Sequence, residues 1–304
     1  MPKGKKISIL MLCHILPNQI NDFIDKLDDG HFDFFIHVDK KSDIQASINK
    51  RSNVYFVSDE RRVDVRWGQY SMVEATLQLI ELAERTDQYD YYWLCSGQDF
   101  PIKRTDEIYE FLSNKNCNFI SIAATRNNPV DGYSNTELDK RCEVVYPNWL
   151  IGKTYVKRGL KKLYNIATGG TGYTFRLFRR IPPCDLKLYF GSQWWCLNRE
   201  TIEWVSQFVD RHPEVCEYYK KTLCSDESFF HTLVMNSPFV NHLESNLVYM
   251  DWSNGDNSPK VLTDTDFDRM MGSGKLLARK VDSRQNRLFY EQLKVICKES
   301  SLKM

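Results

Sequence analysis

Short apolar runs separated by turn residues fill the first 125 residues. The stretches "KISILMLC" (6–13), "FDFFIHVDK" (32–40) and "NVYFVSDE" (53–60) are rich in β-branched and aromatic residues, and each predicts a strand. The stretches "YDYYWLCSGQDFP" (89–101) and "NFISIA" (118–123) predict two more.

Helical patterns lie between these strands. In residues 71–87 the pattern places Met72, Leu79 and Ala83 on one face, and Ser71 with Glu74 predicts a capping box. A shorter helix is expected over 105–114. This alternation predicts an α/β fold with a mostly parallel central sheet flanked by helices.

In such sheets ligands bind at the carboxyl ends of the strands. The candidate binding residues are therefore those that follow a strand: Asp39, the run from Arg66 to Gly68, and the run from Ser96 to Asp99. We assign Asp39 and Arg66 to the donor side of the site. Asp99 follows a glycine in a Gly-Gln-Asp-Phe-Pro loop, so it is either a site residue or simply a turn residue.

Residues 126–304 begin differently and then return to ordered elements. Between Leu150 and Arg180 there are eight Lys or Arg residues and no Asp or Glu. Further on, the patterns predict a strand at 191–200, helices at 200–213, 213–223 and 226–237, and a strand before residue 251. With no repeat or low-complexity linker, we expect one domain, with a nucleotide-binding part at about 1–125 and an acceptor-side, catalytic part at about 126–304.

Composition excludes several classes of protein. Lys plus Arg (41) nearly equals Asp plus Glu (40), which argues against a nucleic-acid partner. No signal peptide is visible, and no apolar run reaches the roughly 20 residues that a membrane span needs. The nine cysteines contain no C-x-x-C pair, so we expect packed thiols and a cytoplasmic location.

Motifs for metals and phosphate loops are also missing. The sequence contains no P-loop, no Rossmann glycine pattern, no H-E-x-x-H and no G-x-S-x-G. The cluster "DTDFD" (264–268) is the one candidate for a metal, but a helix start capped by Thr263 with an acidic first turn is the better explanation. His14 and His37 lie in or at the ends of strands, either against a ligand or as hydrogen-bonded core or rim residues.

The stretch "SDESFF" (225–230) places Asp226 and Glu227 where a helix begins. Acids there favour the helix dipole, which is the bland explanation. The other explanation is chemical: a single carboxylate suits sugar transfer, because the attacking hydroxyl must lose a proton. The leaving diphosphate then needs cations, and Lys260, Arg279 and Lys280 are available late in the chain.

Seven stretches, in order along the chain, together resemble a known family, the core-2/I-branching β-1,6-N-acetylglucosaminyltransferases and peptide O-xylosyltransferases. The stretches are "FFIHVDKKSD" (34–43), "VRWGQYSMVEATLQLI" (65–80), "YWLCSGQDFPIK" (92–103), "GSQWWCLNRE" (191–200), "SDESFFHTLVMNSPF" (225–239), "YMDWSNGDNSPKVLT" (249–263) and "SGKLLARKVD" (273–282). The resemblance runs from residue 7 to about residue 290.

This resemblance implies a GT-A-type glycosyltransferase fold that inverts the anomeric centre of a UDP-sugar without a metal or other cofactor. It places the catalytic base at Glu227 and the diphosphate contacts at Lys260, Arg279 and Lys280, with Asp39 near the nucleoside. The resemblance places a further group of residues on the acceptor or sugar side: Asp99, Gln193, Trp194, Trp252 and Asp226. Asp226 is expected to be the cap or orienting neighbour of Glu227. The two tryptophans are either acceptor-lining or core residues.

This chain departs from the animal members of the family in two ways. Gln193 and Trp194 replace smaller or differently shaped residues of the animal branching enzymes, which leaves donor sugar and acceptor open. The animal enzymes also begin with a membrane anchor and carry paired cysteines, and this chain shows neither. We therefore expect a bacterial, cytoplasmic member that moves GlcNAc or xylose with a β-linkage to a glycan or lipid-linked glycan, in surface polysaccharide synthesis.

Other interpretations remain open at this point. A glycoside hydrolase would need two carboxyls at a set separation, and adjacent acids on a helix make a poor pair. A non-catalytic glycan-binding protein would need aromatics but no base. The basic segment 150–180 is either a solvated face or a peripheral contact with the inner face of an anionic membrane.

Overall fold

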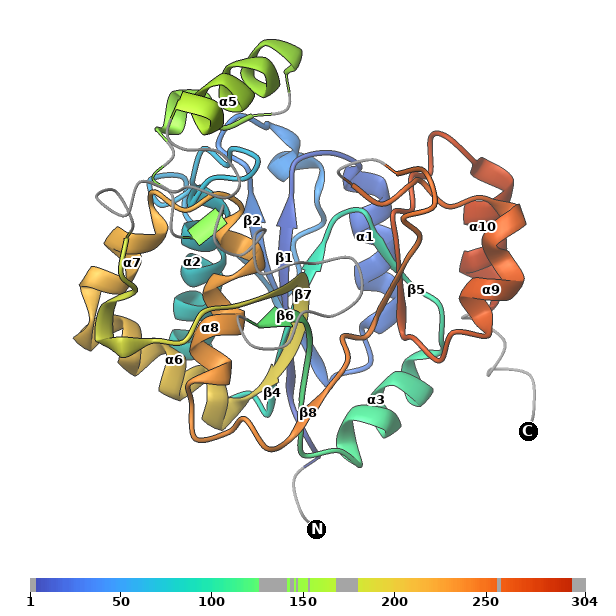
Figure 1. Cartoon of the computed structure of the whole chain (residues 1–304). Helices are drawn as coiled ribbons and strands as arrows, with labels where there is room; N and C mark the ends of the chain where they lie inside the picture. Colours follow the sequence, from blue (N-terminus) through green and yellow to red (C-terminus); the bar gives the residue numbers. More distant parts are fainter. Residues whose placement is uncertain are drawn as a thin grey trace.

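A computed structural model describes residues 4–125, 141–142, 145, 147–152, 154–167, 180–255 and 258–296. The glycine-rich stretch 168–175, most of segment 126–146 and the ninth cysteine, Cys297, lie outside these residues. In the described chain a central seven-stranded sheet carries helices on both faces (Figure 1). This confirms the predicted α/β class with a mostly parallel sheet.

The strands of the central sheet have the spatial order β3-β2-β1-β4-β7-β6-β8. All the described pairings are parallel except those of β7, which is antiparallel to β4 and β6. The bounds are β1 Ile7–Cys13, β2 Phe32–Val38, β3 Val54–Phe56, β4 Tyr91–Ser96, β6 Asn118–Thr125, β7 Tyr189–Asn198 and β8 Leu243–Glu244.

A second, smaller sheet has the order β5-β10-β9. Its strands are β5 Asp99–Pro101, β9 Val248–Met250 and β10 Leu277–Arg279. Because β5 follows β4 almost immediately, this sheet brings the late strands β9 and β10 beside the carboxyl end of β4.

The helices divide between two sides of the central sheet (Figure 1). On one side lie α2 Ser71–Thr86, α6 Arg199–Arg211, α7 Pro213–Tyr219 and α8 Phe229–Met235; on the other lie α1 Pro17–Leu27, α3 Thr105–Ser113, α9 Phe267–Met271 and α10 Arg287–Ile296. Helix α5 Tyr155–Ala167 stands apart at the edge of the molecule. Short 3₁₀ turns span Ile44–Ser47, Asn148–Leu150, Pro183–Asp185, Ser225–Glu227 and Asp264–Asp266.

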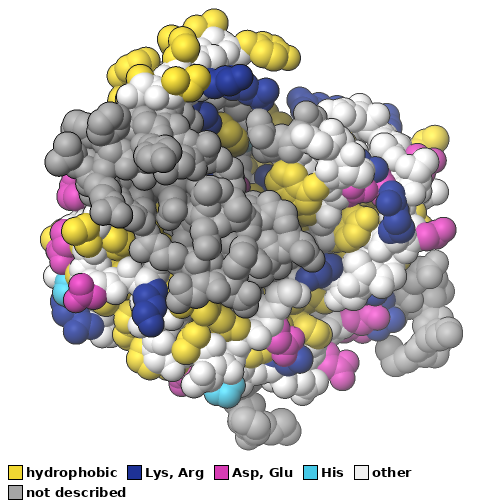
Figure 2. All heavy atoms as spheres, viewed as in Figure 1, with side chains coloured by type: hydrophobic (Ala, Val, Ile, Leu, Met, Phe, Trp, Pro, Cys, Tyr) yellow, Lys and Arg dark blue, Asp and Glu magenta, His cyan; other side chains and the backbone are white. Residues whose placement is uncertain are grey.

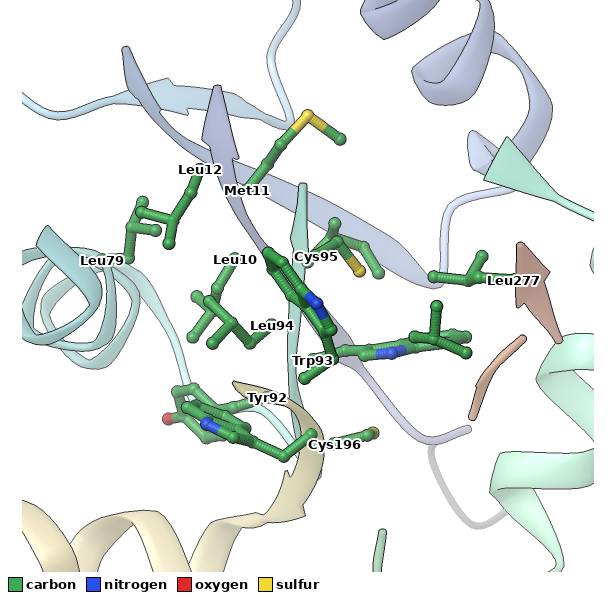
Figure 3. Packing of buried hydrophobic residues seen from close by; sticks show 14 of the residues in the cluster. Leu10, Met11, Leu12, Leu79, Tyr92, Trp93, Leu94, Cys95, Cys196 and Leu277 are labelled. Carbon is green, nitrogen blue, oxygen red and sulfur yellow. The ribbon is translucent and has the colours of Figure 1, made fainter. Parts of the chain in front are cut away.

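The core lies on both faces of the central sheet, because successive side chains of a strand point to opposite faces. Every residue of β1, β2 and β4 is buried, as expected for strands covered on both faces. Figure 3 shows Leu10 and Leu12 pointing toward Leu79 of α2, whereas Met11 and Cys95 point to the opposite face. The main apolar cluster includes residues from both predicted parts of the chain, and the single-domain assignment stays a prediction.

Two local predictions about helix caps have opposite outcomes. The capping box at Ser71 and Glu74 is wrong: Tyr70 is the N-cap of α2, and the Ser71 hydroxyl instead accepts a hydrogen bond from the Arg66 backbone N–H at 2.8 Å. The cap at Thr263 is confirmed, because Thr263 and Asp266 form a reciprocal capping box. Of the acids at 264–268, Asp266 therefore helps to cap the helix start.

Candidate active site

The carboxyl ends of β1, β2, β4 and β6 meet at one edge of the sheet. Strand β7 runs the other way, so its first residues, from Tyr189 to Trp194, lie at this same edge. The small sheet adds Arg279 and Lys280 at the end of β10. Segments from six parts of the sequence thus converge on the edge where ligands bind in such folds.

Two adjoining pockets open at this edge. The carboxylate pocket encloses about 270 Å³ and is lined by Trp67, Met72, Ser121, Ala123, Gly191, Ser192, Gln193, Trp194, Asp226, Glu227, Met250, Trp252, Ser258, Pro259, Arg279 and Lys280. The histidine pocket encloses about 370 Å³ and is lined by Leu12, Cys13, His14, His37, Asp39, Lys41, Val65, Trp67, Met72, Ser96, Gln98, Gln193, Trp194 and Arg279. Each volume is near the lower limit for ligand pockets, so a nucleotide-sized ligand would occupy both.

The backbone around Glu227 is fixed by contacts between β7 and α8. The Ser228 hydroxyl donates to the Tyr189 carbonyl at 2.8 Å, and the His231 ring contacts the Ser192 carbonyl at 2.8 Å. Gly191 fits between them because a Cβ there would overlap the Ser121 carbonyl oxygen and the His231 ring. The start of β7 is therefore tied by hydrogen bonds and close packing to the turn and helix that carry Glu227, Ser228 and His231.

Asp226 and Glu227 lie in the 3₁₀ turn Ser225–Glu227, just before α8, and not in the first turn of that helix. The Glu227 side chain is 31% exposed and lines the carboxylate pocket, and its carboxylate forms an ion pair with Arg141. The Arg141 guanidinium also lies over the Phe190 ring, 4.3 Å from its centroid. Arg141 therefore holds Glu227 in place, a role that no sequence signal indicated.

Asp226 differs from its neighbour. Burial and the nearby Glu227 carboxylate raise the pKa of Asp226 to about 7. Although part of Asp226 faces the carboxylate pocket, its Oδ1 is buried and has no hydrogen-bond partner in the described chain, and the same holds for Nε2 of Gln193. Buried polar atoms usually have partners, so these two indicate a site shaped for a polar ligand.

Arg279 joins the two pockets. Its Nη1 donates to Asp99 Oδ1 at 2.7 Å, and its guanidinium stacks over Trp194, 4.2 Å from the ring. Burial raises the pKa of Asp99, although the Arg279 guanidinium opposes this shift. Asp99 lies behind Arg279 and lines neither pocket, so it contacts the cation rather than the space where a ligand would lie.

The two predicted lysines occupy different positions. Lys280 lines the carboxylate pocket together with Glu227. Lys260 lines neither pocket: its Nζ is 3.2 Å from Asp251 and 2.7 Å from Asp266, both buried carboxylates. The backbones of the two lysines are joined by a hydrogen bond of 3.3 Å, yet only Lys280 faces the site.

In the histidine pocket, Asp39 lines the same space as His14 and His37. Lys41 Nζ is 3.0 Å from Asp39 Oδ1. His37 accepts a hydrogen bond from the Val63 N–H at 2.9 Å, and burial lowers its pKa to about 4. This pocket therefore offers a neutral imidazole and a paired carboxylate.

Of the other predicted site residues, three line a pocket and one, Arg66, does not. Gln193, Trp194 and Trp252 line the carboxylate pocket, and Trp252 is 49% exposed there. Arg66 lines neither pocket and pairs with Asp64 at 2.9 Å. Its neighbour Trp67, within the flagged run 66–68, lines both pockets instead.

One cluster of metal-type donors occurs among the described residues, and it lies outside both pockets. Cys184 Sγ, His212 Nδ1 and Glu214 Oε1 are 3.0–3.3 Å apart on the surface. Cys184 is exposed, so the expectation of plain packing is wrong for this thiol, whereas Cys13, Cys95 and Cys196 are buried as predicted. The described acids of 264–268 form no such donor group.

Comparison with known proteins finds curated relatives, a solved structure and a family profile. Human xylosyltransferase 1 is 29% identical over 233 residues, covering 73% of this chain and 21% of the relative. Rat xylosyltransferase 2 is 28% identical over 233 residues, covering 73% and 24%. The solved galactosyltransferase LgtC, in complex with donor and acceptor sugar analogues, covers 96% of this chain at 9% identity and a TM-score of 0.38, too low to support an argument.

The chain thus spans less than a quarter of the length of these curated relatives. The profile of the core-2/I-branching enzymes matches residues 18–271, most of the chain, and this segment contains Asp39, Gln193 and Glu227. That match confirms the resemblance drawn from the seven stretches. The chain belongs to the core-2/I-branching enzyme family.

Proposed function

We propose that the protein is an inverting glycosyltransferase that transfers a sugar from a UDP-sugar to a glycan hydroxyl and leaves a β-linkage. The observation that carries this proposal is the arrangement of the two pockets around Arg279. A nucleotide sugar has a nucleoside at one end, a sugar at the other and a diphosphate between them. Two pockets joined at a cation match that order.

In this arrangement the nucleoside occupies the histidine pocket, near Asp39, and the sugar occupies the carboxylate pocket. The diphosphate lies between Arg279 and Lys280. As the bond to the anomeric carbon breaks, negative charge grows on the diphosphate, and side-chain cations already in place stabilise it. Arg279 is held by Asp99 and Trp194 before the ligand arrives, so little reorganisation is needed.

Glu227 then takes the proton from the attacking hydroxyl. It is the partly exposed carboxylate of the carboxylate pocket, and Arg141 fixes its orientation. A single base on the face opposite the leaving group is what inversion requires. Asp226 is the weaker candidate for a base because its Oδ1 is buried, whereas the Glu227 side chain is partly exposed.

Transfer without a metal is part of the proposal. Its support is that Arg279 and Lys280 both line the carboxylate pocket, and such side-chain cations can do the electrostatic work of a divalent ion. The donor sugar is proposed to be GlcNAc or xylose, the second because the curated relatives are named xylosyltransferases. The acceptor is proposed to be a glycan or a lipid-linked glycan.

The proposal extends to the setting of the enzyme. The eight cysteines in the described chain are free thiols, as is usual in a reducing compartment, and we propose a cytoplasmic location. A bacterial role in surface polysaccharide synthesis is part of the same proposal. None of the helices within the described ranges has the length and apolar character needed to cross a membrane.

The alternatives have less support. A glycoside hydrolase needs a second working carboxyl at a set distance from the first. Asp99 is buried behind Arg279, and Asp226 is the direct chain neighbour of Glu227, so neither makes a good partner. A non-catalytic glycan binder would have no use for a base and cations in one pocket.

A nucleotide-sugar screen tests the proposal. UDP-GlcNAc, UDP-xylose, UDP-glucose and UDP-galactose are each incubated with the protein and a panel of glycan acceptors, with UDP release as the readout, and each reaction is run with EDTA or with Mn²⁺. We expect release from one or two donors, at a rate that EDTA changes by less than about twofold. Loss of activity in EDTA, restored by Mn²⁺, contradicts metal-free transfer; cleavage of a glycan without any UDP-sugar favours the hydrolase.

A further inference from the structure

Helix α5 has two chemically different halves. At 100° per residue, Tyr155, Val156, Leu160, Leu163 and Ile166 fall on one half of its surface. The other half carries four cations, Lys157, Arg158, Lys161 and Lys162, and neither Asp nor Glu occurs in the helix. The helix is amphipathic, and its polar side is purely basic.

The apolar half of α5 faces outward. Its five large apolar side chains are between 41% and 88% exposed, and nearby Trp149 is 64% exposed. Figure 2 shows these yellow side chains at the tip of the molecule, with blue cations below them. An amphipathic helix on a globular protein normally buries its apolar side against the core, so the orientation of α5 is the reverse of the usual one.

The contacts of α5 with the rest of the protein come from its other side. Tyr164 packs against a small buried cluster of Leu150, Ile151, Leu223 and Cys224. Lys157 Nζ donates to the Ile151 carbonyl at 2.9 Å, and both Lys157 and Lys161 are partly buried. The helix is therefore docked through its other side, and none of the described residues covers its apolar face.

We propose that α5 binds the surface of an anionic membrane. An interfacial helix buries Leu, Ile and aromatic side chains at the level of the headgroups while its Lys and Arg residues meet anionic lipid. The composition of α5 and the exposed Trp149 match this pattern. A second copy of the chain fits less well: it would cover the apolar half, but α5 carries no Asp or Glu, so the exposed Arg158 and Lys162 would gain no anionic partner from a second α5.

The position of α5 links this surface to the active site. Trp67, which lines both pockets, packs against the same small cluster as Tyr164, and Cys224 of that cluster precedes Glu227 by three residues. A membrane bound to α5 would thus lie near the mouth of the carboxylate pocket. This last step rests on the proposed function, and it favours an acceptor that is carried on a lipid.

Vesicle co-sedimentation tests the membrane contact without donor or acceptor, so its outcome is independent of catalysis. The full chain is mixed with vesicles of phosphatidylcholine alone or with 30% phosphatidylglycerol, at low and high salt. We expect binding to the anionic vesicles only, with an affinity that falls at least about fivefold at high salt because screening weakens charge attraction. No binding, or binding that ignores both lipid charge and salt, overturns the proposal.

Two variants and one control locate the surface. V156D/L163D is expected to weaken binding more than tenfold, and R158E/K162E by a similar factor, because each lost cation near an anionic surface costs about fivefold. The control L288D changes a similarly exposed leucine on α10 and is expected to bind as the unmodified protein does. Circular dichroism confirms that each variant is folded.

Equal binding by V156D/L163D and the unmodified protein would overturn the assignment to α5. Sedimentation velocity without lipid tests the competing occupant. A dimer that V156D/L163D converts to a monomer would show that α5 covers a second copy, and would also overturn the proposal.

Discussion

Replacing Arg279 by Met should destabilise the protein through the carboxylate that it leaves behind. The Asp99 side chain is fully buried, and its contacts are Arg279 Nη1 at 2.7 Å and the Ser96 N–H at 2.8 Å. Removing one partner of a buried ion pair typically costs about 3–5 kcal/mol, because the remaining charge is uncompensated. That is a large share of the roughly 5–15 kcal/mol that holds a typical domain folded.

The loss should depend on pH in a defined direction. Burial already raises the pKa of Asp99, and removing Arg279 removes the main opposing influence. An acid whose pKa is higher in the folded than in the unfolded state lowers the free energy of unfolding most at high pH. This loss of stability disappears as pH falls through the folded-state pKa. The deficit of R279M should therefore be larger at pH 8 than at pH 5.

Urea unfolding followed by tryptophan fluorescence measures both quantities. The double variant D99N/R279M is the matched control: Asn keeps a hydrogen bond to the Ser96 N–H without the charge, so most of the free energy of unfolding should return. Activity should not return, since Arg279 is proposed to meet the diphosphate. A deficit below about 1 kcal/mol for R279M, or one that is equal at pH 5 and pH 8, would refute this reasoning.

Three further predictions follow from single positions. G191A should destabilise the protein or prevent its folding, because the new Cβ overlaps the Ser121 carbonyl. In G159A, on exposed α5, the new Cβ meets no atom within 4 Å, and the better helix former should raise stability by up to about 1 kcal/mol. Thermal unfolding of both variants checks these predictions. The raised pKa of Asp226 makes the unmodified protein lose stability as pH rises from 4 to 7. D226N lacks this titration, so its free energy of unfolding should increase relative to that of the unmodified protein over the same range. Urea titrations at several pH values measure the difference, and a constant difference would contradict the prediction. K280A should lower kcat about 100-fold or more, whereas K260M should change kcat less than about tenfold and instead reduce stability; steady-state kinetics with equal losses in both variants would contradict the different roles of the two lysines.

Sequence patterns predicted most of the elements because the strands of this sheet are short, apolar and bounded by turn residues. The rule that ligands bind at the carboxyl ends of parallel strands also pointed to Asp39 and the run 66–68, because the loops that follow such strands lie at one edge of the sheet. The pattern of β7 could not show that this strand runs antiparallel. Its direction is what brings Gln193 and Trp194 to the site, and only the resemblance to the family indicated them.

What the sequence could not provide was the pairing of charges. Lys260 and Lys280 looked equivalent along the chain, but buried Asp251 and Asp266 hold Lys260 while Lys280 faces the pocket. Arg141 is far from Glu227 in sequence and belongs to no motif, so nothing marked it. Arg66 and Trp67 are adjacent, and side-chain direction alone decided which of them lines the pockets.

The membrane-facing interpretation of 150–180 was one of two alternatives, and the exposed apolar face of α5 now gives it a specific surface. The sequence showed that Tyr155, Leu160 and Leu163 share one side of a helix. It did not show that this side points away from the core. Orientation is a tertiary property, set here by the contacts of Tyr164 and Lys157.

The central claim is that Glu227 removes a proton from the acceptor, and the turnover of E227Q tests it most directly. The variant keeps the shape of the side chain and a contact for Arg141, so UDP affinity, measured by calorimetry, should be unchanged. We predict that kcat falls about 100- to 10,000-fold, while D226N keeps activity within about tenfold. An E227Q enzyme that binds UDP normally and turns over within tenfold of the unmodified protein would contradict the account.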